Sequence, residues 1–429
     1  MAAREPIMID SFPMSTPAPH TPPHQAELDL QTVAEDQIED FERVVTRGFH
    51  SDFHGDEWVP ERKSYVPGRW FGFRTGDRWV TTALSFPRRM SVPGGMVDVA
   101  GVTAVTVAPA FRRRGLLTAM MRHQLTTISE PIAMLYATES LIYGRFGYGS
   151  LTRHLRLSGK TRELGFLPEV DLGQGSVDEV DLDHYRTVVV PLRASLLGTR
   201  PGHLERDDVW WDGVFTDPER WRDGASAWRF ALHFAADGTP DGYATFRTKR
   251  DSSIADGREV QVSEIDATTP QAYAALWRWL LDLDLIRAFR RGNAPVDDPL
   301  HELVANPRMI KTELSDAAYA RIVDVPAALG ARSYTVDLDL VIEVVDDFLP
   351  KSGGRFRLQG GPDGSGVTRT DHTPDLSLSA RQLAAIYLGG TPATTFARAG
   401  LLTEHTPGMA GLITSAFGSD PAAFTTDFF

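Results

Sequence analysis

The chain contains no cysteine among its 429 residues. This absence excludes a thiol nucleophile, a disulfide framework and a zinc–thiolate site. No apolar run approaches the roughly 18 to 20 residues that a membrane-spanning helix needs. Basic residues are also scarce, with 44 lysines and arginines against 57 aspartates and glutamates. We therefore expect no nucleic-acid partner, no membrane span and no metal, and the acidic balance mildly favours cationic partners such as polyamines.

The first 27 residues contain six prolines and little apolar periodicity. This composition predicts a disordered tail over residues 1–27. The tail lacks a basic segment followed by an apolar core, so we expect no signal peptide and a cytoplasmic protein. The length of the chain predicts two to four domains, and its apolar content of 42% is sufficient to form their cores.

One segment, residues 105–118, has the pattern of an anion-binding site. It reads Val-Thr-Val-Ala-Pro-Ala-Phe-Arg-Arg-Arg-Gly-Leu-Leu-Thr, which predicts a strand ending at Pro109, a loop with three arginines and a helix opened by Gly115. The first N–H groups of a helix have no intrahelical partner and carry the positive end of its dipole. Such a terminus can receive a phosphate, to which arginines form forked hydrogen bonds. A basic loop alone is more often solvated surface, but the flanking strand and helix favour the anion site.

The helix after Gly115 is predicted to be amphipathic and to pack on its own strand. Its apolar face comprises Leu116, Leu117, Met120, Met121, Leu125 and Ile128. A strand, Arg-x-x-Gly-x-Leu and a helix in this order resemble the coenzyme A pyrophosphate loop of the GNAT acetyltransferases. The usual loop ends in Gly or Ala, whereas Leu117 stands there in this chain.

A second motif narrows the resemblance. An apolar run at residues 132–137 precedes Thr-Glu-Ser-Leu-Ile-Tyr-Gly-Arg-Phe-Gly-Tyr-Gly at 138–149, and the chain ends in Thr-Thr-Asp-Phe-Phe. Together these segments resemble the enhanced intracellular survival (Eis) type of N-acetyltransferase, from about residue 28 to the last residue. The resemblance implies an α+β fold with two tandem GNAT-like domains, the second degenerate, followed by a sterol-carrier-protein-like domain. It also implies acetyl-CoA as co-substrate, aminoglycoside amines as acceptors and a homohexamer.

The catalytic GNAT domain is expected over residues 28–158. It should begin with a helix near 35–48 and continue through strands near 70–73, 80–86 and 96–107, and a strand near 151–157 should close it. A second GNAT-like domain is expected over 159–318, where Thr269 and Pro270 start an amphipathic helix. No arginine loop precedes this helix, so we expect a non-catalytic copy that supports the first domain or completes its cleft.

The third domain is expected over residues 319–429, with its C-terminus reaching the active site. Val336, Leu338 and Leu340 alternate with aspartates, which predicts a half-buried strand. Ser379 can cap a helix over 380–388, with Gly389 as its stop. Sterol-carrier-like folds can hold lipids, so a lipid-binding role for this domain stays open.

Acetyl transfer to an amine requires a neutral nucleophile, a polarised thioester carbonyl and a proton for the departing thiolate. No Ser-His-Asp pattern or acyl-enzyme nucleophile is evident, so direct attack within a ternary complex is the simpler mechanism. By the resemblance, the strand backbone at Val105, Thr106 and Val107 holds the pantetheine arm and polarises the carbonyl. The residues matched to the other coenzyme contacts are Arg113, Arg114, Gly115, Leu116, Leu117, Thr118, Thr138 and Glu139. Thr138 and Glu139 also fit a simple turn and helix cap.

The resemblance assigns the role of general acid to Tyr143. A thiol has an ordinary pKa near ~8.5 and a phenol near ~10, so full proton transfer is uphill by roughly 2 kcal/mol. Tyr143 can instead donate a hydrogen bond as negative charge builds on sulfur. Tyr148 is the other candidate, although a tyrosine at either position also fits a core residue.

In the Eis type the general base is the free carboxylate of the last residue, which here is Phe429. Two phenyl rings gain several kcal/mol on burial, so Phe428 and Phe429 should anchor the end of the chain in a pocket. Apolar surroundings make a carboxylate a stronger base. The alternative base is a water molecule held by the backbone and Glu139.

The acceptor should bind near residues 50–58, His-Ser-Asp-Phe-His-Gly-Asp-Glu-Trp, where the family builds its amine cleft. Carboxylates beside aromatic rings suit a polycationic sugar, so Asp52 and Trp58 are the expected contacts. Asp56 and Glu57 fit a solvated acidic loop equally well. Some relatives have an acidic residue before the terminal one, where this chain has Phe428. The alternatives to aminoglycoside or polyamine acetylation are acetylation of protein lysines and a non-enzymatic acyl-CoA- or lipid-binding protein.

Overall fold

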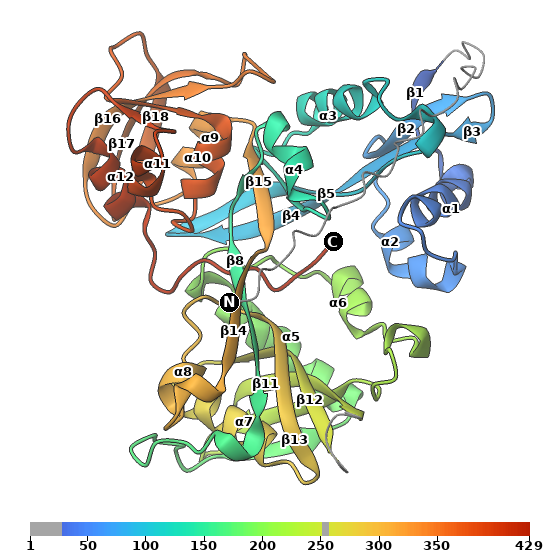
Figure 1. Ribbon diagram of the computed structural model, residues 1–429, viewed down its shortest axis with the longest axis vertical. Helices are drawn as coiled ribbons and strands as arrows, with labels where there is room; N and C mark the ends of the chain where they lie inside the picture. Colours follow the sequence, from blue (N-terminus) through green and yellow to red (C-terminus); the bar gives the residue numbers. More distant parts are fainter. Residues whose placement is uncertain (1–27, 251–256) are drawn as a thin grey trace, which may run out of the picture.

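The computed structural model describes residues 28–250 and 257–429, and the tail expected over residues 1–27 lies outside the described residues. The residues in these two ranges form three sheets, each with its own helices. In Figure 1 the first domain lies at the upper right, the third at the upper left and the second below them, with the C-terminus where the three meet. Within the described ranges, no helix is both long and apolar enough to cross a membrane.

The first sheet contains the strands predicted from the N-terminal pattern. In spatial order its strands are β1 (Asp29–Thr32), β2 (Trp70–Thr75), β4 (Thr81–Val92), β5 (Gly95–Val107), β6 (Ile132–Tyr136), β15 (Ala318–Ile322) and β7 (Gly149–Ser150), with β3 (Arg78–Trp79) paired to β2. Its helices are α1 (Ile38–Gly48), α2 (Val59–Lys63), α3 (Leu116–Thr127) and α4 (Ser140–Tyr143). The predicted apolar face of α3 is confirmed, because Leu116, Met120, Met121 and Leu125 are buried.

The prediction that a strand near 151–157 closes the first sheet is wrong. That segment belongs to β8 (Arg153–Lys160), which pairs with two strands of the second sheet. Leu155 and Leu157 of β8 are buried in the core of the second domain. The first sheet is closed instead by β15, which pairs with both β6 and β7. Period-two alternation identifies β8 as a strand, but it does not reveal which sheet the strand joins.

The second sheet repeats the central unit of the first. Its strands in order are β14 (Lys311–Asp316), β8, β13 (Ile286–Ala294), β12 (Arg258–Ala267), β11 (Pro240–Arg250), β10 (Arg229–Phe234) and β9 (Ser176–Val180). Its helices are α5 (Leu182–Leu196), α6 (Asp208–Phe215), α7 (Pro270–Asp282) and α8 (Leu300–Leu303). The predicted start of α7 is confirmed, because the Thr269 hydroxyl accepts a hydrogen bond from the Ala272 N–H at 3.2 Å. Both β5–α3–β6 and β12–α7–β13 join parallel neighbouring strands through a helix.

The third domain has a five-stranded sheet covered by short helices. Its strands in order are β18 (Gly364–Arg369), β17 (Gly354–Gly361), β16 (Leu338–Val345), β19 (Leu376–Ser379) and β20 (Thr403–Glu404). Its helices are α9 (Val325–Gly330), α10 (Ala380–Ile386), α11 (Ala393–Arg398) and α12 (Met409–Phe417). Ser379 caps α10 as predicted, in a capping box with Gln382. Val336 departs from the prediction: it lies outside β16 and is exposed, because the Thr335 N–H bonds to Ala416 in α12 rather than to the sheet.

Candidate active site

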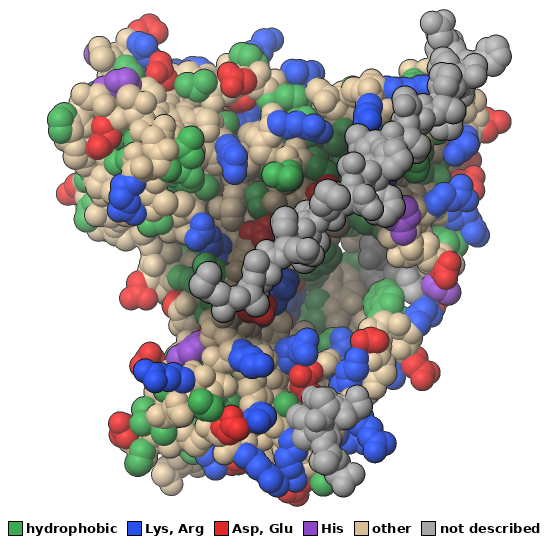
Figure 2. Space-filling view, viewed as in Figure 1, with side chains coloured by type: hydrophobic (Ala, Val, Ile, Leu, Met, Phe, Trp, Pro, Cys, Tyr) green, Lys and Arg blue, Asp and Glu red, His purple; other side chains and the backbone are tan. Residues whose placement is uncertain are grey.

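A cavity of about 800 Å³ opens between the first and second domains and is walled partly by the last residues of the chain. The surface is visibly hollowed between these domains, with hydrophobic side chains exposed in the hollow (Figure 2). Aromatic side chains dominate the walls. They are Phe49, Trp58, Phe86, Tyr136, Tyr143, Trp210, Trp221, Phe428 and Phe429.

A wedge between β5 and β6 forms one wall. These parallel strands pair only from Val99 to Gly101, and beyond Gly101 the two fully described strands no longer pair. A bulge against β4 at this level includes Ala104, whose φ of 54° bends the strand. Val105 faces the cavity, whereas the Thr106 hydroxyl is buried and lies 2.7 Å from that of Thr82. The strand predicted to hold the pantetheine arm therefore lies along an open wedge.

The N-terminus of α3 lies outside the cavity, and no residue from 113 to 118 lines it. Gly115 begins the helix in the left-handed region, at a φ of 80°, and no side chain caps the helix. The three arginines at 112–114 are exposed, whereas Leu116 is buried and Leu117 half-buried. A methyl group added at Gly115 would meet nothing within 4 Å. Exposed arginines, an uncapped helix start and an open wedge suit a pyrophosphate and its pantetheine arm, so these residues fit coenzyme A.

Tyr143 lies at the end of α4, half-buried, and lines the cavity. Burial, and then the charge of Glu139, raise the pKa of its phenol to about 12. Tyr148 is fully buried beside it, with the two ring centres 5.8 Å apart, and is a core residue. Thr138 lines the cavity, but Glu139 is exposed at the start of α4.

Phe429 enters the cavity and is anchored there by aromatic contacts. Its ring centre lies 5.4 Å from that of Tyr136 and 6.3 Å from that of Trp210. A methyl group added at Gly101 would come within 3.1 Å of the Phe429 ring, so the glycine makes room for it. The predicted anchoring is confirmed for Phe429 but wrong for Phe428, which is 76% exposed.

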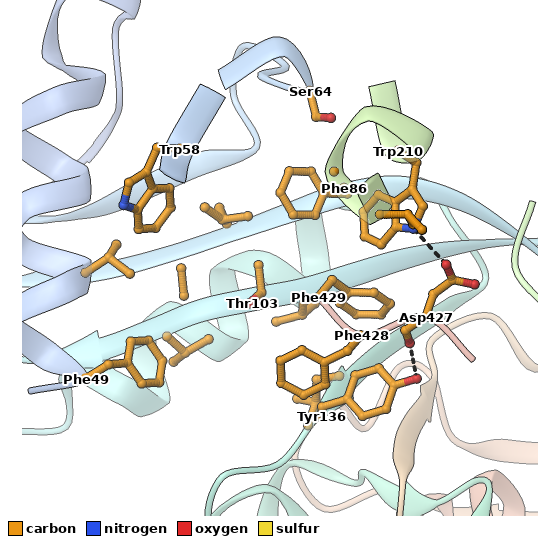
Figure 3. A pocket seen from close by; sticks show the side chains of 18 of the residues that line it. Phe49, Trp58, Ser64, Phe86, Thr103, Tyr136, Trp210, Asp427, Phe428 and Phe429 are labelled. Atoms are coloured by element: carbon orange, nitrogen blue, oxygen red, sulfur yellow. Dashed lines mark hydrogen bonds between the residues drawn. The ribbon is translucent and has the colours of Figure 1, made fainter. Parts of the chain in front are cut away.

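Asp427 connects the end of the chain to the second domain. Its carboxylate accepts hydrogen bonds from Arg206 Nε at 2.6 Å and from the Trp210 indole N–H at 2.7 Å. Its backbone carbonyl accepts a hydrogen bond from the Tyr136 hydroxyl, as Figure 3 shows. Burial opposes ionisation of Asp427, but Arg206, Arg193 and Arg88 outweigh that effect and lower the pKa of the carboxyl to about 2.

Further contacts fix the segment that leads to Asp427. The Thr425 hydroxyl lies 3.1 Å from that of Thr152, and the Thr425 carbonyl accepts a hydrogen bond from Asn293 at 3.1 Å. Arg200 donates to the carbonyl of Ala422 at 2.6 Å. The end of the chain is therefore held by both GNAT-like domains.

The structure brings together both residues predicted to bind the acceptor, because Asp52 and Trp58 line the cavity. Asp56 does not line it and instead pairs with Arg220 at 2.9 Å, and the side chain of Glu57 lies outside the described part. Sequence reasoning missed the contribution of the second domain, namely Arg206, Trp210 and Glu264. These residues carry no local motif, since their roles depend on contacts with residues far along the chain. The only local signal was a carboxylate beside two phenylalanines in the last three residues.

This fold and this site define an N-acetyltransferase of the GNAT class. Residues 29–151 match one acetyltransferase (GNAT) domain, residues 202–322 match another, and residues 325–425 match the sterol carrier protein domain. The expected fold of two GNAT domains followed by a sterol-carrier-like domain is confirmed. These domains also agree with the expectation that acetyl-CoA is the co-substrate.

Relatives that match most of the chain show which family of this class it belongs to. The chain is 40% identical over 361 residues to an uncharacterized N-acetyltransferase of Streptomyces avermitilis, covering 82% of this chain and 87% of the relative. It is 34% identical over 386 residues to the N-acetyltransferase Eis of Mycobacterium tuberculosis, covering 86% and 92% of the two chains. The crystal structure of Eis1 from Mycobacterium abscessus superposes with a TM-score of 0.80 at 30% identity, covering 94% of this chain and 100% of that one. The chain therefore belongs to the Eis family of GNAT N-acetyltransferases, which sets aside the non-enzymatic alternative.

Proposed function

We propose that this enzyme transfers an acetyl group from acetyl-CoA to amines of aminoglycosides or similar polyamines by direct attack in a ternary complex. The observation that carries the proposal is the convergence of Tyr143 and Phe429 on a single cavity. Tyr143 comes from the first domain, and Phe429 is the last residue of the chain. Asp52 and Trp58 line the same cavity and supply a carboxylate and an aromatic face for a cationic sugar.

The terminal carboxylate of Phe429 accepts the proton that the amine loses. Asp427 supports this role, because its bonds to Arg206 and Trp210 fix the backbone two residues before the carboxylate. The α-carboxylate is an unusual base because chain ends commonly fray. Here the packing of the Phe429 ring against Tyr136 opposes fraying.

Tyr143 acts on the leaving sulfur. Its pKa of about 12 exceeds that of a thiol by about 3.5 units, so complete transfer of its proton is uphill by roughly 5 kcal/mol. Tyr143 therefore donates a hydrogen bond to the developing thiolate, and solvent completes the protonation. Because solvent supplies the proton, Tyr143 keeps its own proton and stays neutral across the physiological pH range.

Coenzyme A provides the acetyl thioester, and the chain holds it with the residues inferred from the resemblance. The backbone of Val105, Thr106 and Val107 lies along the open wedge and polarises the carbonyl. At the start of α3, Arg113 and Arg114 contact the pyrophosphate. The backbone donors there come from Gly115, Leu116, Leu117 and Thr118, and Thr138 and Glu139 complete the contacts. The open wedge and the uncapped helix support this assignment.

The proposal is tested by the release of coenzyme A with kanamycin as acceptor. We expect deletion of Phe429 to lower kcat by about 10²- to 10⁴-fold, the usual range for loss of a general base. Phe429→Leu is the matched control, because it keeps the carboxylate in place, and it should retain most activity. Tyr143→Phe should lower kcat while acetyl-CoA still binds.

Equal turnover with and without Phe429 would discard the terminal base and keep the enzyme class. A folded protein that releases no coenzyme A with kanamycin, but does so with a lysine-containing peptide, would replace polyamines by protein lysines. The homohexamer and the cytoplasmic location expected from the resemblance remain predictions. Light scattering that gives the mass of one chain would reject the hexamer.

A further inference from the structure

We propose that Asp346 and Phe348 of the third domain are positioning residues for acetyl transfer, because the loop that they form holds the segment that carries Tyr143. The inference rests on the proposed role of Tyr143 at the leaving sulfur. Neither Asp346 nor Phe348 lines the cavity, so each acts on Tyr143 through the residues that lie between them. The sterol-carrier-like domain thereby takes part in the reaction through contacts within the protein.

The segment that carries Tyr143, residues 140–148, has little regular structure of its own. α4 is one short turn, and no side chain caps its start. A 3-10 turn over Gly144–Phe146 follows, and Gly147 then adopts a left-handed φ of 85°. A helix as short as α4 is not stable in water without tertiary contacts. The position of Tyr143 therefore depends on the surfaces that pack against this segment.

The third domain contacts this segment through α10 and through a loop. Figure 1 shows α4 at the boundary between the first and third domains, where Arg381 of α10 lies against Gly144. The loop comprises residues 346–349 and directly follows β16. Its Phe348 packs on Phe146 of the segment, with the two ring centres 5.0 Å apart. Because aromatic rings prefer particular relative orientations, this contact fixes how the loop and the segment lie against each other.

Asp346 gives this loop its shape. One carboxylate oxygen accepts hydrogen bonds from the N–H groups of Phe348, at 3.2 Å, and Leu349, at 2.8 Å. The other oxygen pairs with Arg321 of β15, and both side chains of this pair are buried. Hydrogen bonds between charged groups are strong, and they are stronger in the protein interior than in water. Asp346 therefore fixes the 346–349 loop on the first sheet.

Arg321 connects the same ion pair to the segment that carries Tyr143. Its guanidinium lies against Gly147, because a methyl group added there would come within 2.8 Å of Nη1. In the described part of the chain, Nε and Nη1 of Arg321 have no hydrogen-bond partner, so the bond to Asp346 orients this side chain. Asp346 thus acts on the segment both through its loop and through Arg321.

The two sets of contacts meet in the core beside Tyr143. Phe146 and Tyr148 are buried in one hydrophobic cluster with Leu349 of the loop. Tyr143 packs against this cluster, with its ring centre 5.8 Å from that of Tyr148. A reacting group that is misplaced by about 1 Å can lose about 10²-fold in rate. Loss of the loop contacts should therefore lower kcat, because the Tyr143 hydroxyl moves away from the leaving sulfur.

The affinity for the coenzyme should not depend on this loop. The loop does contact α3, where Arg122 donates a hydrogen bond to the Phe348 carbonyl at 2.9 Å. Arg122 is exposed and lies in the middle of α3, whereas the pyrophosphate is expected at the start of this helix. Removal of the Phe348 side chain therefore leaves the start of α3 in place. The inference predicts a lower kcat with an unchanged Kd for acetyl-CoA.

The test is steady-state release of coenzyme A by the full chain with kanamycin as acceptor. We expect Phe348→Ala to lower kcat roughly 10-fold and to change the Kd for acetyl-CoA, measured by titration calorimetry, by less than about twofold. Phe348→Tyr keeps the ring and should retain most of the kcat. Asp346→Asn should also lower kcat, because a neutral amide makes a weaker bond to Arg321.

Phe396→Ala is the matched control. Phe396 is another half-buried phenylalanine of the third domain, but it packs on a different hydrophobic core. Its loss should leave kcat unchanged.

The decisive variant combines Phe348→Ala with Tyr143→Phe. Residues that act as one unit have effects that do not add. If Phe348 acts by placing the Tyr143 hydroxyl, the combined variant should have the kcat of Tyr143→Phe alone, because that hydroxyl is already gone.

Three results would overturn the inference and leave the proposed function standing. They are an unchanged kcat in Phe348→Ala, an equal loss in Phe396→Ala, and losses that multiply in the combined variant. A rise in the Kd for acetyl-CoA that matches the fall in kcat would do the same. An unchanged kcat in Tyr143→Phe would instead overturn the proposed role of Tyr143, and the inference with it.

Discussion

The two GNAT-like domains contain the same strand–helix–strand unit but treat the start of its helix in opposite ways. In β5–α3–β6 the helix begins at Gly115, without a side-chain cap and beside exposed arginines. In β12–α7–β13 the Thr269 hydroxyl caps the helix, and Pro270 at the first position has no N–H to offer. In the first unit, the backbone N–H groups at the start of the helix have no side-chain cap and can bind an anion. In the second unit, one N–H group is bound by Thr269 and another is missing because the residue is Pro270. The difference agrees with the proposal that the first copy, and not the second, holds the pyrophosphate of coenzyme A.

The two units also differ at the ends of their parallel strands, because one end is open to a ligand and the other binds the C-terminal segment. Beyond the paired part of β5 and β6 the wedge is left open, and Val105 faces the cavity. At the corresponding end of the second unit, Asn293 on β13 holds the carbonyl of Thr425. Glu264 on β12 holds Arg206, which in turn holds Asp427. One copy leaves room for a ligand, and the other binds the end of its own chain.

The largest effect on stability should come from removing the ion pair between Asp427 and Arg206 of the second domain. Asp427→Asn leaves Arg206 buried with less compensation, and we expect the free energy of unfolding to fall by about 3–5 kcal/mol, as measured by urea denaturation. Asp56→Asn is the control, because Asp56 pairs with Arg220 on the surface and should matter little. If the two variants lost the same free energy of unfolding, the buried ion pair of Asp427 would stabilise the fold no more than the surface pair of Asp56 does.

The same contact predicts a dependence on pH. The pKa of Asp427 is about 2 in the folded protein, below its ordinary value of about 3.9, so ionisation stabilises the fold by roughly 2–3 kcal/mol at neutral pH. This contribution is fully present above about pH 5 and is lost as the pH falls towards 2. The stability difference between the protein and Asp427→Asn should therefore shrink between pH 5 and pH 3. A constant difference over that range would contradict the low pKa.

Arg114→Ala tests the first copy. Loss of a charge-assisted hydrogen bond to phosphate costs about 1.5–3 kcal/mol, so the Kd for acetyl-CoA should rise about 10- to 100-fold by titration calorimetry. Arg278→Ala, on α7 of the second copy, should leave this Kd unchanged. A similar rise in both variants would indicate a general effect of charge rather than a pyrophosphate contact.

The smallest effect should follow from Thr269→Ala. Removal of the cap from α7 should lower stability by about 1 kcal/mol, because the N–H of Ala272 loses its partner. Binding of acetyl-CoA should not change. Tighter or weaker binding in this variant would mean that the second helix start also takes part in holding the coenzyme.

Local patterns predicted the features that depend on local chemistry. The apolar face of α3, the threonine cap of α7 and the capping box at Ser379 each follow from residues within one or two helical turns. Pairing between distant segments leaves no such pattern, so the sequence predicts the wrong sheet for β8 and does not predict the pairing of β15 with β6 and β7. Phe428 and Phe429 are identical in hydrophobicity, yet only the latter is anchored in the cavity. The sequence does not predict the role of Arg206 for a related reason. Its burial and its partners, Asp427 and Glu264, depend on contacts between residues that are far apart in the chain.

The position of β15 has a consequence for how the chain folds. This strand lies between β6 and β7 but follows the entire second domain in sequence. During synthesis, β6 keeps an unprotected edge until residue 322 has left the ribosome, and such long-range pairing slows folding. A gene fragment ending near residue 158 should yield an incomplete sheet prone to aggregation. The two GNAT-like domains have separate sheets, but no single cut in the chain separates them, because β15 of the first sheet follows the second domain in sequence.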